Sequence, residues 1–304
     1  MQRLLRLFSR ATPRPASAPP TRAAWAVAAD TPPMTVRTAS VTDVGCVRPG
    51  NEDDVRIVTP TDAADAARHG VLAVVCDGMG GHEAGEVASR LAVETLVRRY
   101  REAMTTPDAD PQRTLPAAVL AANHAIFEAA QRDASLRGMG TTCTAFVLRG
   151  QLGYCAHVGD SRLYLARDGA LFHMTEDHSA VMQLVHRGVL TPHDARWHAD
   201  RNVLARALGS RRDVEVTAWP TPFAVRQGDR FLLCSDGLHD LVPEADLYTE
   251  LSTQAPADAC ARLVQRARAA GGPDNISVAI IVIDADSRAS QPGPIAALPE
   301  VLGA

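Results

Sequence analysis

Apolar and polar positions along the chain follow two different periods, which predicts a protein with both strands and helices. Short runs of β-branched or apolar residues bounded by turn residues predict strands. These are expected at residues 55–59, 71–76, 141–148, 153–158, 162–166, 214–219, 230–234 and 276–283. The segments "RGQ" at 149–151 and "RDG" at 167–169 are typical of hairpin turns, so the strands that each one joins should be antiparallel.

Three longer stretches carry the period of a helix. The first, residues 84–103, follows a glycine-rich segment, and the third covers residues 257–270. The second covers residues 116–132 and places Pro116 in its first turn, where proline is well suited. Its apolar residues recur at helical spacing, at Val119, Ala122, Ile126, Phe127 and Ala130. Because strands and helices each cluster rather than alternate, the pattern favours α+β layers over a doubly wound sheet.

The two ends of the chain differ from its middle. Residues 1–35 are rich in arginine, proline and alanine, a composition typical of disorder, although an organelle transit peptide would look similar. Residues 286–304 are predicted to form a flexible tail. Between them we find neither an internal repeat nor a linker. Residues 36–285 are therefore predicted to form a single domain.

Charge and composition exclude several classes of function. The net charge of −4 gives no electrostatic attraction to nucleic acid, and no apolar run is long enough to span a membrane. All 31 basic residues are arginine, so mechanisms that need a lysine, including that of a P-loop nucleotide site, are excluded. The six cysteines form no C-x-x-C pair, which indicates buried free thiols in a reducing compartment. We therefore expect a cytoplasmic protein.

An acidic residue stands at one end of five strand-like runs. These residues are Asp53 in "RPGNEDD", Asp77 in "VVCDG", Asp160 in "AHVGDSR", Asp236 in "FLLCSDG" and Asp274 in "GGPDN". Aspartate followed by glycine is ordinary turn chemistry at any one place. Turn formation, however, does not require an apolar core run beside each of five acids. Clustered carboxylates repel one another unless a cation neutralises them, and oxygen ligands suit Mg²⁺ or Mn²⁺.

The segment that starts at Asp77 fits a site where one carboxylate bridges two ions. Gly78 follows directly, and a glycine there lets the backbone come close and offer its own carbonyl oxygen. Two ions about 3.5–4 Å apart can activate a bridging water for an in-line displacement. Arg48 would supply a planar fork for a tetrahedral oxyanion such as phosphate.

With these motifs in this order, the stretch from residue 39 to residue 283 resembles the metal-dependent protein serine/threonine phosphatases of type 2C, in their bacterial form. The resemblance implies a four-layer α-β-β-α sandwich of two antiparallel sheets flanked by helices, with the metals at one edge between the sheets. It also implies hydrolysis of phosphoserine and phosphothreonine monoesters by a metal-activated bridging water. The implied cofactors are two tightly bound Mn²⁺ or Mg²⁺ ions and a third, weaker one.

The resemblance assigns roles to the residues of the first motifs. Arg48 in "RPGNED" resembles the arginine that grips the substrate phosphate. Glu52 and Asp53 resemble acids that hold metal-bound water, and Asp53 belongs with the metal-binding set. Asp77 resembles the bridging metal ligand, and the Gly78 carbonyl resembles a ligand of one ion.

The later motifs complete the expected site. Asp160 in "VGDSR" resembles a ligand of the third ion. Asp236 and Asp274 resemble ligands of the second ion, with Asn275 beside them. The catalytic set is thus expected to be Arg48, Asp77 and Asp236.

Other parts of the resemblance concern structure and proton transfer. Thr141 and Thr142 are expected to be structural, and residues 175–209 resemble the variable flap of the family. The animal branch has a histidine after its aspartate-glycine pair, proposed as general acid, where this chain has Met79. The general acid therefore stays open, with a metal-bound water as the first hypothesis and His82 as the second.

Two alternatives remain beside an active phosphatase. The first is a catalytically weak module of the same fold that binds phosphoproteins; such proteins lose metal-ligand acids, whereas this chain keeps them. The second is a phosphatase for signalling partners such as anti-sigma-factor antagonists, which would usually bring an attached sensor domain. The flap histidines, at 186, 193 and 198, match no common zinc spacing and are expected to be exposed. Expected partners are phosphorylated proteins, including a serine/threonine kinase and its substrates, and the chain is expected to be a monomer.

Overall fold

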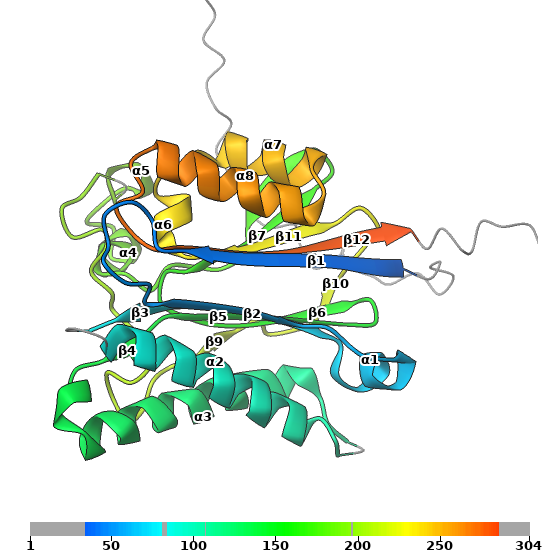
Figure 1. Ribbon diagram of the computed structural model, residues 1–304, viewed down its shortest axis with the longest axis horizontal. Helices are drawn as coiled ribbons and strands as arrows, with labels where there is room; N and C mark the ends of the chain where they lie inside the picture. The colour runs from blue at the N-terminus through cyan, green and yellow to red at the C-terminus, as the bar shows by residue number, and fades with distance from the viewer. Residues whose placement is uncertain (1–33, 81–83, 107, 196, 286–304) are drawn as a thin grey trace, which may run out of the picture.

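Two antiparallel sheets pack face to face, and a layer of helices covers the outer face of each (Figure 1). The computed structural model describes residues 34–80, 84–106, 108–195 and 197–285. The four-layer α-β-β-α sandwich predicted from the sequence is confirmed. Within the described part of the chain, no helix is both long and apolar enough to cross a membrane.

Each sheet combines strands from distant parts of the chain. The five-stranded sheet has, in spatial order, β1 (Met34–Asp43), β12 (Ile276–Ala285), β11 (Arg230–Cys234), β7 (Arg162–Arg167) and β8 (Ala170–His173). The main path of the seven-stranded sheet is β10 (Phe223–Ala224), β6 (Leu152–Val158), β5 (Cys143–Arg149), β3 (Val71–Met79) and β2 (Asp53–Val58). Two short strands complete it, β4 (Gly140–Thr141) on β3 and β9 (Thr217–Ala218) on β6.

Long helices cover the sheets, and short ones lie in the connections. The helices α2 (Ala84–Ala103) and α3 (Pro111–Arg132) pack on the seven-stranded sheet, whereas α7 (Glu244–Thr253) and α8 (Pro256–Ala269) pack on the other. The short helices are α1 (Ala63–His69), α4 (Ala180–His186), α5 (Pro192–Ala195), α6 (Asp236–His239) and the 3₁₀ turn η2 (Ala134–Leu136). A further buried apolar cluster fills the space between the sheets.

The packing of strand β3 explains why its sequence is continuously apolar. Val74 and Cys76 belong to the cluster under α2 and α3, whereas Ala73 and Val75 belong to the cluster between the sheets. Both faces of the strand are therefore buried, and neither face favours polar residues. The same strand carries Asp77 out of the core at its end.

The predicted strands are largely confirmed, with three omissions and two corrections. The two hairpins form antiparallel pairs, β5 with β6 and β7 with β8. The sequence reading missed β1, β8 and β10, because β1 is a partly exposed edge strand without an apolar run and the others are very short. The predicted strand 141–148 is two strands that break at Thr142. Of the predicted strand 214–219, only Thr217–Ala218 pairs, with β6.

The second long helix begins earlier than predicted. Its first residue is Pro111, and the side chain of Asp110 caps it by accepting a hydrogen bond from the Gln112 amide. Pro116 therefore lies inside the helix and not in its first turn. The Asp110 cap and the proline at the first position set the start of the helix, and Pro116 removes one hydrogen bond within it.

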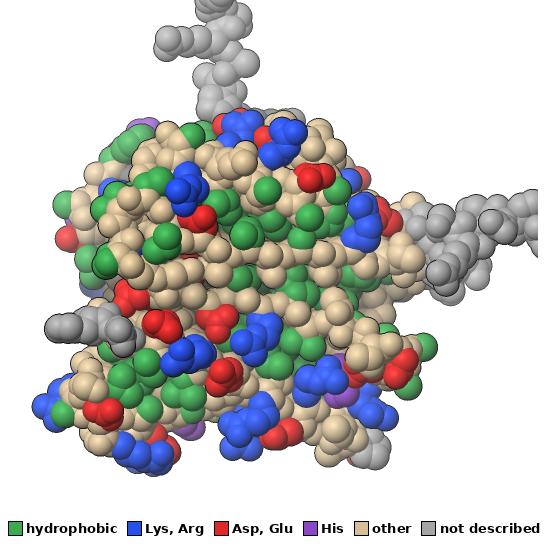
Figure 2. Space-filling view, viewed as in Figure 1, with side chains coloured by type: hydrophobic (Ala, Val, Ile, Leu, Met, Phe, Trp, Pro, Cys, Tyr) green, Lys and Arg blue, Asp and Glu red, His purple; other side chains and the backbone are tan. Residues whose placement is uncertain are grey.

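The prediction of buried thiols is correct for five cysteines and wrong for one. Cys46 is exposed on the loop between β1 and β2, and the other five are buried; all six are free. On the face shown in Figure 2, acidic and basic side chains are interspersed rather than gathered by sign.

Candidate metal centre

The acidic residues singled out in the sequence lie close enough for their charges to act on Asp77, at the edge of the sandwich where α6 begins with Asp236 (Figure 1). Asp53 and Asp77 are direct register partners in the antiparallel pair β2–β3. Asp160 follows β6, Asp236 opens the short helix after β11, and Asp274 stands just before β12. The two sheets thus contribute acids to one place, which the sequence order alone does not reveal.

Two threonines hold Asp77 through its backbone. The Asp77 amide donates to the Thr142 hydroxyl at 2.9 Å, and the Thr142 amide donates back to the Asp77 carbonyl at 2.9 Å. The Thr141 hydroxyl also donates to that carbonyl, at 2.9 Å. The break between β4 and β5 puts the Thr142 side chain in this position. The expectation that both threonines are structural is therefore confirmed.

The glycines that follow two of the aspartates are required by close packing of backbone. A Cβ at Gly78 would lie 2.2 Å from the Gly85 carbonyl oxygen and 2.3 Å from that of Glu52. A Cβ at Gly237 would lie 2.0 Å from the carbonyl oxygen of Asn275. Neither Gly78 nor Gly237 has a positive φ, so turn geometry is not the reason for glycine here. Glycine instead lets the segments around the centre approach one another.

Asn275 fixes the loop that carries Arg48. Its Oδ1 accepts a hydrogen bond from the Glu52 amide at 2.8 Å. Its Nδ2 donates to the carbonyls of Val44 at 2.9 Å and Gly50 at 3.0 Å. The side chain expected merely beside the second ion is thus a structural link between β12 and the β1–β2 loop.

Arg48 lies at the rim of the acidic cluster. Its Nη2 is 2.7 Å from Asp274 Oδ2, and both side chains are partly exposed. This hydrogen bond is the main reason why the pKa of Arg48 is raised, and the charges of Glu52 and Asp77 contribute in the same direction. The guanidinium therefore faces the centre and stays accessible from outside.

Burial and mutual repulsion disfavour ionisation of the central acids. Burial raises the pKa of Asp53 to about 7, partly offset by hydrogen bonds from Ser277 and Ser235. Burial also raises the pKa of Asp77 well above its ordinary value, and the charges of Asp53, Asp236, Asp160 and Asp274 raise it further. The pKa values of Asp160 and Asp236 are raised for the same two reasons. Carboxylates in such an arrangement need a cation to stay ionised.

The residues present fit divalent cations. Two buried carboxylate oxygens, Glu52 Oε1 and Asp236 Oδ1, have no hydrogen-bond partner among the described residues, as ligand atoms would. Across the same residues, no three His, Cys, Asp or Glu side chains converge into a ready ligand set, and Asp274 is bound to Arg48. Mg²⁺ and related ions take one or two carboxylates each and keep several waters, so a closed cage of side chains is not required.

The structure adds three residues that the sequence reading missed. The Ser235 hydroxyl donates to Asp53 Oδ2 at 2.8 Å and accepts from the Ser277 amide at 2.9 Å, which links the two sheets. His239 Nε2 lies 3.1 Å from the Asp160 carbonyl oxygen. Ser235 and His239 stand within "CSDGLH", so their closeness to Asp236 was the available signal.

Two sequence hypotheses about histidines have different outcomes. His82 lies outside the described residues. The flap histidines do not form a site with one another: His193 is highly exposed, His186 pairs with Glu176 at the surface, and His198 is about one-third exposed. The expectation of solvent-facing flap histidines is thus correct for two and only partly correct for His198.

Comparison with known proteins assigns the class of this fold and centre. The family described as Protein phosphatase 2C matches residues 51–276. The serine/threonine protein phosphatase PstP of Mycobacterium tuberculosis is 40% identical over 260 residues, which are 85% of this chain and 47% of PstP. The serine/threonine phosphatase stp of Listeria monocytogenes is 36% identical over 245 residues, covering 80% of this chain and 94% of stp.

Solved structures agree with this assignment. The catalytic domain of PstP in complex with 2 manganese ions has a TM-score of 0.70 and 38% identity, covering 83% of this chain and 100% of that domain. The serine/threonine phosphatase of S. agalactiae has a TM-score of 0.73 and 31% identity, covering 82% and 99%. The chain belongs to the protein phosphatase 2C family. It spans about half the length of PstP, the relative matched with highest identity above.

Proposed function

We propose that this protein is a metal-dependent protein serine/threonine phosphatase that hydrolyses phosphoserine and phosphothreonine in proteins. The observation that carries the proposal is the buried carboxylate cluster, built from both sheets, with Arg48 at its rim. The names of the relatives support it, since PstP and stp are both serine/threonine phosphatases.

Some residues of the centre would bind two Mn²⁺ or Mg²⁺ ions, and others would orient water. Asp77 would contribute to holding both ions, and the Gly78 carbonyl would be a ligand of the first. Asp236 and Asp274 would hold the second, while Glu52 and Asp53 would orient water at the centre. When bound, the ions supply an activated water as nucleophile and neutralise charge on the phosphate oxygens. The PstP structure with 2 manganese ions supports this choice of metals.

Arg48 binds the substrate phosphate in this proposal. A guanidinium offers two parallel N–H donors to a phosphate oxygen pair. In the structure one of these groups, Nη2, donates to Asp274 Oδ2 at 2.7 Å. A phosphate role for Arg48 and a ligand role for Asp274 both require this ion pair to open. The pair is partly exposed, so it is weakly held and can exchange partners.

Several finer expectations belong to the same proposal. Residues 36–285 form the phosphatase domain. The substrates are phosphorylated proteins, including a serine/threonine kinase and its targets, and the protein works as a monomer in the cytoplasm. Asp160 holds a third, weaker ion together with water. Calorimetry tests the last point: Asp160→Ala should lose a weak Mn²⁺ site and keep two tight ones.

The experiment that tests the proposal measures phosphate release from a phosphothreonine peptide and from p-nitrophenyl phosphate, with Mn²⁺ and with a chelator. Release that depends on Mn²⁺ is expected with both. Folded protein that binds the phosphopeptide but releases no phosphate under any metal condition would instead identify a binding module of the same fold.

A further inference from the structure

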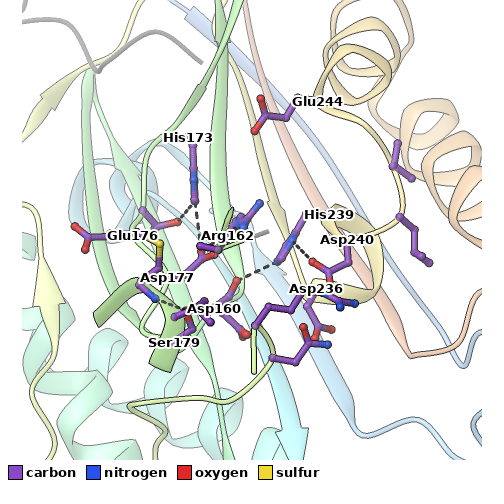
Figure 3. A pocket seen from close by; sticks show the side chains of 18 of the residues that line it. Asp160, Arg162, His173, Glu176, Asp177, Ser179, Asp236, His239, Asp240 and Glu244 are labelled. Carbon is purple, nitrogen blue, oxygen red and sulfur yellow. Dashed lines mark hydrogen bonds and ion pairs between the residues drawn. The ribbon is translucent and has the colours of Figure 1, made fainter. Parts of the chain in front are cut away.

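A cavity of about 630 Å³ lies directly beside the candidate metal centre. One wall comes from the flap, residues 175–209, and the other from α6 and the segment that leads into α7 (Figure 3). Asp160 and Asp236, two of the proposed ion ligands, line the cavity. Trp197 of the flap also lines the cavity and is 79% exposed, so the cavity opens to solvent at this residue. The cavity therefore leads from the solvent to the side of the centre that Asp160 and Asp236 form.

Among the lining residues that the structure describes, acidic side chains outnumber basic ones. The basic residues of this set are Arg162 and Arg201, and the acids are Asp160, Glu176, Asp177, Asp236, Asp240 and Glu244. Arg162 is fully engaged, since its Nη2 is 2.6 Å from Asp177 Oδ2 and its Nε is 3.0 Å from Asp177 Oδ1. Among the described lining residues, six acids therefore share the cavity with two arginines.

His239 carries a hydrogen-bond acceptor in this cavity that has no donor. Its side chain is 3% exposed and lines the cavity. Nε2 lies 3.1 Å from the Asp160 carbonyl oxygen, which can only accept, so Nε2 carries the hydrogen. In the neutral ring Nδ1 is then an acceptor. It has no hydrogen-bond partner in the described structure, and the oxygen 3.3 Å away, Asp240 Oδ1, also accepts. A buried acceptor without a partner requires a donor, and Asp240, whose side chain is 29% exposed, places a second acceptor beside it.

The flap already places a cation near these acceptors. Arg201 Nε is 3.7 Å from Asp240 Oδ2, and the Arg201 side chain is 48% exposed. At that distance the two groups attract each other without a hydrogen bond, and an exposed pair of this kind contributes little free energy. A guanidinium can therefore reach Asp240, and the one present is easily displaced.

We propose that the cavity binds a basic side chain of the phosphoprotein substrate, with arginine favoured over lysine. The proposal rests on the phosphatase function argued above, because the phosphate at the metal centre holds the peptide beside the cavity. The basic residue would stand within about three positions of the phosphoresidue, since an extended chain spans at most about 3.5 Å per residue. Its N–H groups would satisfy His239 Nδ1 and Asp240, and Arg201 would move aside. Glu244, on the same wall, adds negative charge. The planar fork of arginine offers more donors to this pair than an ammonium does.

The test uses full-length protein with Mn²⁺ and a set of phosphothreonine peptides. The peptides carry arginine, glutamine or glutamate at one position, which is moved from three residues before to three residues after the phosphothreonine. The readout is the ratio of kcat/KM for the arginine peptide to that for the glutamine peptide. At the best position we expect a ratio of about five or more, as one charge-assisted hydrogen bond would give. The glutamate peptide should fall below the glutamine peptide.

Three variants locate the effect in the cavity. Glu244→Gln and Asp240→Asn should each bring the ratio towards one. Arg201→Gln should raise it, because it removes the internal cation that competes for Asp240. Glu128→Gln is the matched control, since Glu128 is an exposed acid on α3, outside the cavity, and should leave the ratio unchanged.

Three results would overturn the inference. A wild-type ratio near one at every position would mean that no basic side chain is recognised. A high ratio that survives both Glu244→Gln and Asp240→Asn would move the recognition elsewhere. Failure to hydrolyse p-nitrophenyl phosphate, which needs no peptide contact, would refute the phosphatase proposal itself and would remove the basis of this one.

Discussion

Each acidic residue of the centre depends on a small set of neighbours. Ser235 and Ser277 donate to Asp53, and Thr141 and Thr142 fix the backbone of Asp77. These neighbours are short hydroxyl residues that satisfy buried polar groups without adding charge. The carboxylates themselves are left for a cation.

The residue scale yields a prediction for Asp236. Asp236→Asn should lower Mn²⁺-dependent kcat by about 100-fold or more, because it removes a carboxylate proposed to hold the second ion. The metal-free fold should be no less stable, since the pKa of Asp236 is raised by burial and neighbouring acids, which means that its charge is unfavourable there. Phosphate release and thermal unfolding measure the two effects.

A matched variant makes the Asp236 test specific. Asp258→Asn changes an exposed acid on α8 and should leave both measurements unaltered. Turnover of Asp236→Asn close to that of the unaltered protein would show that Asp236 is not a metal ligand.

Gly78 provides a second prediction at this scale. Gly78→Ala places a Cβ 2.2 Å from the Gly85 carbonyl oxygen, so backbone must shift. We expect a loss of about 1–3 kcal/mol in the free energy of unfolding, the usual cost of overpacking. Urea denaturation measures it, with Gly50→Ala as control, because a Cβ at Gly50 meets nothing within 4 Å. Equal stability of the two variants would contradict the close-packing argument.

At the scale of elements, the break between β4 and β5 is a functional feature. A single straight strand would pair continuously with β3, whereas the observed break puts the Thr142 hydroxyl against the Asp77 amide at 2.9 Å. The Thr142 hydroxyl also contacts Ser161 Oγ at 2.6 Å, beside Asp160. One side chain therefore connects the elements that carry two of the acids.

Thr142→Val tests this connection. Valine keeps the shape but leaves the buried Asp77 amide without its acceptor, which should cost about 1–3 kcal/mol in the free energy of unfolding. Mn²⁺-dependent activity should fall as well, because Asp77 loses its support. Thr144→Val is an unsuitable control, since that hydroxyl is also buried and bonded. Thr249→Val is suitable, since Thr249 is exposed on α7.

At the scale of the whole molecule, the flap is joined to the sandwich through neutral histidine. His178, at the start of the flap, accepts a hydrogen bond at Nδ1 from the Gly159 amide at 3.1 Å. Its pKa is lowered to about 3, mainly by burial and further by the nearby charges of His157 and Arg206. Only the neutral ring can accept that bond, so the attachment of the flap depends on pH.

The expected consequence is a loss of stability in acid. As the pH falls below about 6.5, the unfolded chain binds a proton at His178 and the folded protein does not, so folding becomes less favourable. The slope is at most about 1.4 kcal/mol per pH unit and smaller here, because the ring is only partly buried. Urea denaturation at pH 7, 6 and 5 measures it.

His178→Gln is the variant for comparison, since glutamine can accept the same hydrogen bond without titrating. The stability of the unaltered protein should fall relative to this variant between pH 7 and pH 5. Parallel pH profiles for the two proteins would show that His178 does not contribute. Acids of the centre titrate in both proteins, so they cancel in the comparison.

The sequence by itself determined where most strands and helices lie along the chain. Apolar runs located most strands, because a strand buried on both faces, such as β3, accepts only apolar residues. The five acids at strand ends were visible for the same reason, since a carboxylate after a core run is conspicuous. The predicted bounds of the helix at 84–103 match those of α2. The predicted start of the second helix at Pro116 is too late, because Asp110 and Pro111 begin α3.

Long-range pairing is what only the tertiary structure decided. β1 joins β12 along ten residue pairs although its own sequence has no apolar run, because its partner supplies the buried face. The same pairing brings Asn275 to the loop of Arg48, and the pairing of β11 with β7 places His239 against Asp160. The acid-lined cavity forms between the flap and α6, which are distant in sequence. Local preferences cannot encode such contacts, because they arise from the pairing and packing of segments that are far apart in the sequence.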